Sequence, residues 1–220
     1  MKLVLASGSQ RRRELLTMCG YDYEIIVSNA DETIDENDPE SFVRALSFRK
    51  AKEVFDRLFA AGRRDFAVIG SDTVVAFQKD GETKPVIIGK PKDAKDAVRI
   101  LSMLSGKTHR VFTGVSVIAD IPDENADAQC SIREKAEIQT ECSITEVTFE
   151  TLSPDEITDY VNSGDPLDKA GSYGIQGPFG MFVREIRGNY FTVIGMPIPV
   201  LYKMLKKIGI LPHGFYERIE

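Results

Sequence analysis

Short runs of apolar residues alternate along this chain with longer stretches whose apolar positions recur every three or four residues. Runs of the first kind are typical of buried strands, and stretches of the second kind are typical of helices that cover a sheet. The alternation has no strict repeat and no linker that divides the chain, so we expect one α/β or mixed α+β domain. The predicted strands are residues 2–6, 66–69, 73–77, 86–88, 111–119, 143–149, 181–186 and 191–194.

Capping residues mark where the predicted helices begin and end. Asp38 followed by Pro39 is typical of a helix start, because the carboxylate accepts from free amides and proline fits the first turn. Asp93 precedes another helical stretch, and Ser153 with Glu156 has the spacing of a capping box. The predicted helices run from Arg12 to Cys19, from Asp38 to before Gly62, from Asp93 to before Gly106, from Ser153 to before Gly164, and from Pro197 to before Gly209.

The turn after the first predicted strand is a candidate phosphate site. Ser7 to Ser9 is a run of small residues whose amides and hydroxyls can close on an anion at the start of a helix. Arg11 to Arg13 follow, and positive charges there oppose the helix dipole by a few tenths to ~1 kcal/mol each. A bound polyphosphate would make these positive charges favourable. The alternative is that the arginines form a solvated helix face. The Gly-Lys-Ser/Thr of a P-loop is missing.

Lys50 is a second candidate, because it falls inside the apolar stripe of the second predicted helix. At about 100° per residue from Val43, Lys50 lies near 340° and Val54 near 20°. An ammonium that points inward needs an anionic partner, which either the protein or a ligand could supply. A structural ion pair and a stem that reaches solvent are the alternatives.

Asp72 follows an apolar strand at Gly70-Ser71-Asp72, which we interpret as a bend between two strands. Ligands commonly bind at the carboxyl ends of strands in α/β sheets. A carboxylate there can accept a proton from water or hold a divalent metal, although it can also simply bond to its own turn. Glu32 is a candidate partner for Asp72.

Two further segments carry candidate ligand-binding groups. Lys90 lies at a strand end beside a rigid proline, which is a weak signal alone. The glycine-rich residues 171–180 would let the backbone approach a flat ligand, and Gln176 could bond to a base edge with one donor and one acceptor. A bulged strand is the alternative. His109 and His213 have no Ser, Cys or Asp at a recognisable spacing, so we expect no catalytic role for them.

Composition limits the class of protein. The chain has 220 residues, 42% of them hydrophobic, and a formal net charge of −6, which disfavours binding to a nucleic-acid polymer or an anionic membrane. It contains no apolar run long enough to span a bilayer and no leader, so we expect a cytoplasmic protein. Three cysteines without metal-ligand spacing argue against a disulfide framework.

Six segments carry a family resemblance: residues 5–16 (LASGSQRRRELL), 70–75 (GSDTVV), 89–91 (GKP), 104–109 (LSGKTH), 168–177 (DKAGSYGIQG) and 195–197 (GMP). In this order they resemble the motifs of the Maf family of nucleotide pyrophosphatases, over nearly the whole chain. The resemblance implies an elongated mixed sheet flanked by helices, with two lobes and a central cleft, as in the inosine-triphosphate pyrophosphatases. The chain would then be one Maf-like domain of two lobes, residues 1–220. Its residues 120–142 are long, polar and acidic, which indicates an exposed insertion or an extended hairpin tip.

The resemblance also implies an activity and a set of site residues. The activity is hydrolysis of a nucleoside triphosphate to the monophosphate and pyrophosphate with a divalent cation, Mg²⁺, Mn²⁺ or Co²⁺. Asp72 corresponds to the family's catalytic base and, with Glu32, to its metal-binding acids. Phosphate-facing positions are matched by Ser7, Arg12, Lys50 and Lys90, and positions associated with base choice by Arg11, Thr73 and Gln176.

Within the family, residues 173–177 (YGIQG) resemble the branch that hydrolyses dTTP and UTP. A purine-directed pyrophosphatase, acting on 7-methyl-GTP or inosine triphosphate, is the alternative enzyme. A nucleotide-binding regulator of cell division with vestigial hydrolysis is the alternative of another class. Gln10 departs from the family's usual proline, and the sequence leaves open whether the chain forms a homodimer.

Overall fold

The computed structural model describes residues 1–78, 81–121 and 136–214. They form a mixed seven-stranded sheet in the order β2-β1-β3-β5-β6-β7, with β4 paired to β3. β1 pairs in parallel with β2 and β3, and the other pairs are antiparallel. The strands are β1 (Lys2–Leu5), β2 (Glu24–Ile25), β3 (Phe66–Phe77), β4 (Val86–Ile88), β5 (Thr108–Asp120), β6 (Ala136–Phe149) and β7 (Val183–Arg187).

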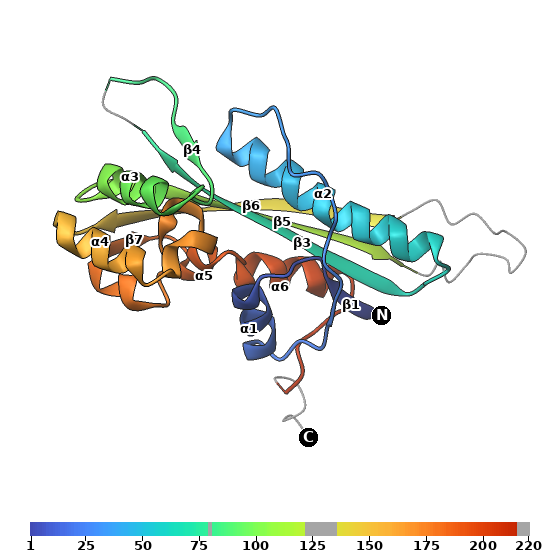
Figure 1. Cartoon of the computed structure of the whole chain (residues 1–220). Helices are drawn as coiled ribbons and strands as arrows, with labels where there is room; N and C mark the ends of the chain where they lie inside the picture. The colour runs from blue at the N-terminus through green and yellow to red at the C-terminus, as the bar shows by residue number, and fades with distance from the viewer. Residues whose placement is uncertain (79–80, 122–135, 215–220) are drawn as a thin grey trace, which may run out of the picture.

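Helices cover both faces of this elongated sheet. The long helix α2 lies along one face of β3 and β5, and α1 and α6 lie on the other side (Figure 1). α3, α4 and the 3₁₀ segments gather at the end of the sheet near β7 (Figure 1). The helices are α1 (Gln10–Met18), α2 (Pro39–Ala60), α3 (Ala94–Leu104), α4 (Pro154–Asn162), α5 (Tyr190–Ile194) and α6 (Ile198–Lys207), with 3₁₀ segments η1 (Asp165–Asp168), η2 (Ala170–Ser172) and η3 (Pro178–Phe182).

Burial on both faces explains the apolar runs in β1 and in the first part of β3. Successive side chains of a strand point to opposite faces, so alternate residues enter different cores. Val68 packs in the core beneath α2 with Val54, whereas Ile69 packs in the core on the opposite face with Leu16 and Leu201. Residues 3–5 of β1 and residues 66–69 of β3 are therefore all apolar.

Two glycines let α2 approach the sheet closely. A Cβ atom on Gly70 would lie 2.2 Å from the backbone oxygen of Ser47, and one on Gly114 would lie 2.2 Å from that of Val43. Side chains cannot fit at either point, so the helix backbone rests almost directly on β3 and β5. This contact places the middle of α2 over the centre of β3.

The capping signals correctly predicted where three helices begin. The side chain of Asp38 accepts from the amide of Ser41 at 2.9 Å, and Asp93 acts in the same way at α3. At α4, Ser153 and Glu156 form both hydrogen bonds of the capping box. These signals are local, which is why the sequence alone reveals them.

The predicted bend at residues 70–72 is wrong, because β3 runs without interruption from Phe66 to Phe77 and pairs with β5 throughout 67–76. Gly70 is small because α2 lies against it, and it does not form a turn. The predicted strand at 191–194 is also wrong. These residues form α5, which Asn189 caps through the amide of Phe191 and which ends at Gly195 in a left-handed conformation.

Two other boundaries differ from the prediction. Residues 178–182 form η3, so β7 begins only at Val183 and not at 181. The expected insertion at 120–142 is shorter, because residues 136–142 belong to β6 and Asp120 pairs with Ala136. The rest of that insertion, residues 122–135, lies outside the described residues, as does Cys130. Cys19 and Cys142 are half-buried free thiols.

Candidate active site

The edge of the sheet is interrupted at the centre of β3. β1 pairs with β3 as far as Ile69, and β4 pairs with the same side of β3 only from Val75 onward. Among the described residues, no strand covers this side of β3 between Gly70 and Val74. We call this gap the β3 notch. Side chains from both faces of the sheet can therefore reach one place.

Asp72 faces the α2 side of the notch. It lies two residues after Gly70, whose missing side chain would point at α2, so it shares that face. The ammonium of Lys50 donates to Oδ1 of Asp72 at 2.8 Å and lies 2.9 Å from Oε1 of Glu32. Both Lys50 and Asp72 side chains are 12% exposed, whereas that of Glu32 is 66% exposed. The predicted inward direction of Lys50 is correct.

Arg12 occupies the opposite face of the notch. Its guanidinium donates to Oγ of Ser7 at 3.1 Å, to the carbonyl oxygen of Gly195 at 2.9 Å and to Oγ1 of Thr73 at 3.4 Å. Burial lowers the pKa of Arg12, and the negative charge of Asp72 partly offsets this effect. An arginine remains charged under such a shift, so the three acceptors fix a positive charge at the start of α1.

Arg11 points to another group of charges. It donates to Oδ2 of Asp168 at 3.0 Å, across 157 positions of sequence. Lys169 donates to Oδ1 of Asp168 at 2.7 Å and to Oδ1 of Asp165 at 3.0 Å. Burial alone would raise the pKa of Asp168, but the hydrogen bonds from Lys169 and Arg11 outweigh it and lower that pKa. This ionic cluster connects α1 with η1.

The glycine-rich segment forms a wall beside these groups. Tyr173 is buried and its hydroxyl lies 3.0 Å from Nε2 of His109, a residue for which the sequence indicated no partner. The hydroxyl of Tyr160 accepts from the amide of Gly174 at 3.1 Å. Gln176 is exposed, and its amide makes no hydrogen bond within the described part of the chain. The backbone is therefore anchored while the Gln176 side chain remains available to a ligand.

Most of these groups line one cavity of about 940 Å³. The structure thus brings together every site residue that the sequence predicted. The ionic partners Asp165, Asp168 and Lys169 also line this cavity. The sequence indicated Asp168 and Lys169 only as part of the motif at residues 168–177, and it did not indicate Asp165. The predicted residues on its wall are Ser7, Arg11, Arg12, Glu32, Lys50, Asp72, Thr73, Lys90 and Gln176.

Glu32 and Asp72 are the two carboxylates that share the Lys50 ammonium. Within residues 1–78, 81–121 and 136–214, no cluster of three or more His, Cys, Asp or Glu side chains could hold a metal ion. Mg²⁺, however, is often bound by one or two carboxylates and completes its shell with substrate phosphates and water. The donor set therefore fits a hard divalent cation that a phosphate chain helps to bind.

Comparison with known proteins shows the family of this chain. A family described as Maf-like protein matches residues 2–208. The chain belongs to the Maf-like protein family. A relative from Agathobacter rectalis named dTTP/UTP pyrophosphatase is 40% identical, covering 95% of this chain and 98% of the relative. Another of the same name, from Bacillus thuringiensis subsp. konkukian, is 42% identical, covering 95% of this chain and 96% of the relative.

The fold of this Maf-like protein also occurs in a distant solved structure. The Staphylococcus aureus Ham1 protein superposes with a TM-score of 0.51 at 16% identity, covering 94% of this chain and 99% of that one. This similarity confirms the expected mixed sheet flanked by helices. Among the described helices, none has the length and hydropathy that a membrane crossing requires.

Proposed function

We propose that this Maf-like protein is a pyrophosphatase that hydrolyses dTTP and UTP to the monophosphate and pyrophosphate. One observation carries the proposal: a single cavity combines a fixed arginine at a helix start, a carboxylate at the β3 notch and a glycine-rich wall with a free amide. The arginine would bind phosphate, the carboxylate would act as a general base, and the amide would contact the nucleobase. Relatives that are 40–42% identical and named dTTP/UTP pyrophosphatase support the same activity.

The phosphate chain would bind to cations that the protein already holds in place. Arg12 is fixed by three acceptors, so binding needs no rearrangement of its guanidinium. Lys50 would exchange part of its contact with Glu32 for a phosphate oxygen. Lys90 is exposed and makes no ion pair within the described part of the chain, so it can neutralise the leaving pyrophosphate.

Asp72 would accept the proton of the attacking water. Its carboxylate lines the cavity, and Lys50 holds one of its oxygens, leaving the other for water. The water oxygen attacks the α-phosphorus as the bond to the β-phosphate oxygen breaks. Proton transfer of this kind contributes typically about 10²- to 10⁴-fold in rate. A divalent cation at Glu32 and Asp72 would, when bound, neutralise phosphate charge.

Gln176 is the group best suited to select the base. The hydroxyl of Thr73 lies 3.0 Å from that of Thr113 and accepts from Arg12, and Arg11 is paired with Asp168, so both have partners already. The amide of Gln176 offers one donor pair and one acceptor to a pyrimidine edge. Arg11 and Thr73 would then act on base choice by shaping the wall.

The test is release of pyrophosphate and monophosphate from dTTP, UTP, GTP, 7-methyl-GTP and inosine triphosphate, with and without Mg²⁺. We expect dTTP and UTP to be cleaved fastest. Asp72→Asn should lower kcat about 10²- to 10⁴-fold while binding of a non-hydrolysable dUTP analogue, measured by calorimetry, persists.

Asp159→Asn is the matched control, because Asp159 is an exposed carboxylate on α4 outside the cavity. It should keep wild-type turnover. Faster cleavage of purine triphosphates would replace the proposed substrate by a purine nucleotide. Nucleotide binding without turnover of any triphosphate would favour a regulatory role, and full activity of Asp72→Asn would refute the assignment of the base.

A further inference from the structure

A second cavity, of about 690 Å³, adjoins the first on the α2 side of the sheet. The two cavities share four lining residues, Glu32, Asp72, Thr73 and Lys90. These residues lie at or beside the β3 notch, so the two spaces meet where the reaction would occur. Gln176 and Arg12 line the first cavity only.

The arrangement gives the substrate a direction. In the proposed function the base lies near Gln176, and its phosphates extend past Arg12 towards Asp72 and Lys90. The terminal phosphate then faces the second cavity, on the side away from the base. Anything attached to that phosphate would have to enter this space or remain in solvent.

The second cavity does not resemble a site for phosphate alone. Phe42 and Leu46 of α2, Val74 of β3, and Pro85 and Ile87 at β4 form an apolar wall. Phe42 and Ile87 are only partly buried against the apolar cluster beneath this wall, so their side chains present apolar surface to the cavity. Pyrophosphate would leave this surface unused, whereas an aromatic ring would cover it.

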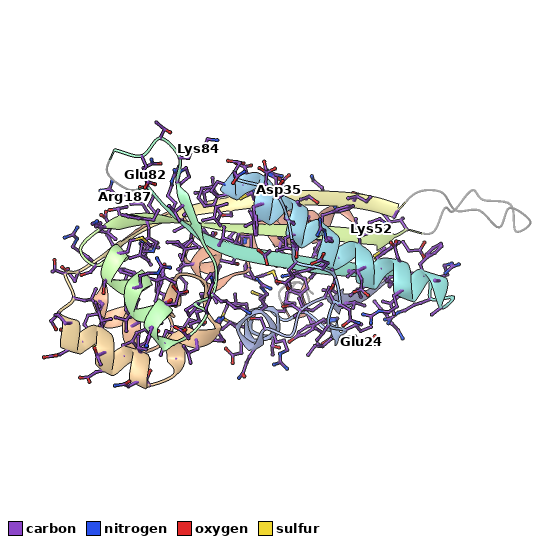
Figure 2. The ribbon with its side chains drawn as sticks, turned by 45° about the horizontal axis from the view of Figure 1, so that its top comes forward. Glu24, Asp35, Lys52, Glu82, Lys84 and Arg187 are labelled. Atoms are coloured by element: carbon purple, nitrogen blue, oxygen red, sulfur yellow. The ribbon has the colours of Figure 1, made fainter. Side chains whose placement is uncertain are left out.

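Two lysines and Glu36 line this cavity beside the apolar wall. Figure 2 shows Lys84 on the segment that connects β3 with β4. Lys84 and Lys90 both line the second cavity and are exposed, and within the described residues neither forms an ion pair. Together with the apolar wall, they provide charge for a phosphate and a surface for a ring attached to it.

We propose that the second cavity receives an aromatic or nucleoside group esterified to the distal phosphate, so that the enzyme also hydrolyses such substituted nucleoside polyphosphates. The inference rests on the proposed function. For a γ-phenyl ester of dTTP, the water oxygen bonds to the α-phosphorus and the bond from that phosphorus to the bridging oxygen breaks. The products are dTMP and phenyl pyrophosphate, which keeps the bridging oxygen, and the water proton passes through Asp72 to solvent.

The experiment compares kcat/KM for dTTP and for its γ-phenyl ester. In the wild-type protein we expect the two values to agree within about tenfold, because the distal group is accommodated. Ile87→Trp should fill the second cavity and lower kcat/KM for the ester about tenfold or more, with dTTP hydrolysis changed less than about threefold. Hydrolysis of dTTP also shows that the variant is folded.

Two further variants complete the test. Ile138→Trp is the control, because Ile138 is a 55% exposed strand isoleucine that lines neither cavity, and both substrates should be cleaved as by the wild type. Phe42→Ala removes the aromatic ring from the apolar wall. It should raise KM for the ester by about three- to tenfold and leave KM for dTTP unchanged.

The outcomes separate this inference from the proposed function. Cleavage of dTTP with no cleavage of the ester overturns the inference and leaves the proposed function intact. Cleavage of the ester that neither Ile87→Trp nor Phe42→Ala affects also overturns it, because the group then lies elsewhere. If neither substrate is cleaved, the proposed function itself fails and the inference with it.

Discussion

His109 should make the stability of this protein sensitive to mild acid. Its ring is 2% exposed and packs edge-on against Phe149 and Tyr173, with centroids 4.7 and 5.4 Å away. Nε2 is hydrogen-bonded to the Tyr173 hydroxyl, whereas Nδ1 has no hydrogen-bond partner among the described residues. Burial lowers the pKa of His109 to about 3. It also raises the pKa of Tyr173, so this neighbour stays neutral as well.

The size of the effect follows from proton linkage. An unfolded histidine titrates near pKa 6.5, so below that pH the unfolded chain binds a proton that the folded chain excludes. The stabilising contribution is therefore complete above about pH 6.5 and is lost as the pH falls towards about 3, by about 1.4 kcal/mol per pH unit. Between about pH 7.5 and about pH 5 the loss amounts to about 2 kcal/mol.

Urea unfolding of the wild type and of His109→Gln at those two pH values measures this loss. Glutamine keeps a hydrogen-bonding group but does not titrate, so the wild type should lose about 2 kcal/mol more than the variant. His213→Gln is the control, because the side chain of His213 is 66% exposed, and it should follow the wild type. Equal pH dependence of the wild type and His109→Gln would refute the reasoning.

Three other predictions test the site and the fold. Gln176→Ala should reduce the preference for dTTP over GTP, measured as a ratio of kcat/KM, by about two- to tenfold, and an unchanged ratio would exclude base reading by this amide. Gly114→Ala should lower the free energy of unfolding by about 3 kcal/mol, because its Cβ would meet a backbone oxygen of α2, whereas Gly89→Ala, with no atom within 4 Å, should change it by less than about 0.5 kcal/mol. Asp168→Asn should free Arg11 for phosphate and lower KM for dTTP roughly two- to fivefold, since an exposed ion pair is worth up to about 1 kcal/mol. A higher KM would show that Asp168 itself assists binding.

Local signals account for most of what the sequence predicted correctly. The caps at Asp38, Asp93 and Ser153 act within one helical turn, so their outcome does not depend on distant residues. The segment 191–194 has no such local signal, because three apolar residues and a threonine fit a short helix as well as a strand. The role of Gly70 could not be predicted, because a side chain there would clash with the backbone of α2, and no local sequence pattern shows that contact.

The site shows the same division. Lys50 could be assigned to the interior from helical periodicity, and its ion pair with Asp72 follows from where α2 lies. The pairing of Arg11 with Asp168 could not be predicted, because 157 positions separate the two residues and the contact exists only in the folded chain. The hydrogen bond of His109 could not be predicted for the same reason, since its partner Tyr173 is 64 positions away.

The uninterrupted course of β3 gives the reaction centre a rigid frame. Asp72 and Thr73 are consecutive residues of one strand, paired on its other side with Gly114 and Thr113 of β5. Their separation is therefore set by the rise of a strand, about 3.3 Å per residue. Any adjustment to a substrate would then fall to the outer elements, above all the glycine-rich wall with the exposed Gln176. Specificity can then change through those outer elements while the spacing between the two faces of the centre stays constant.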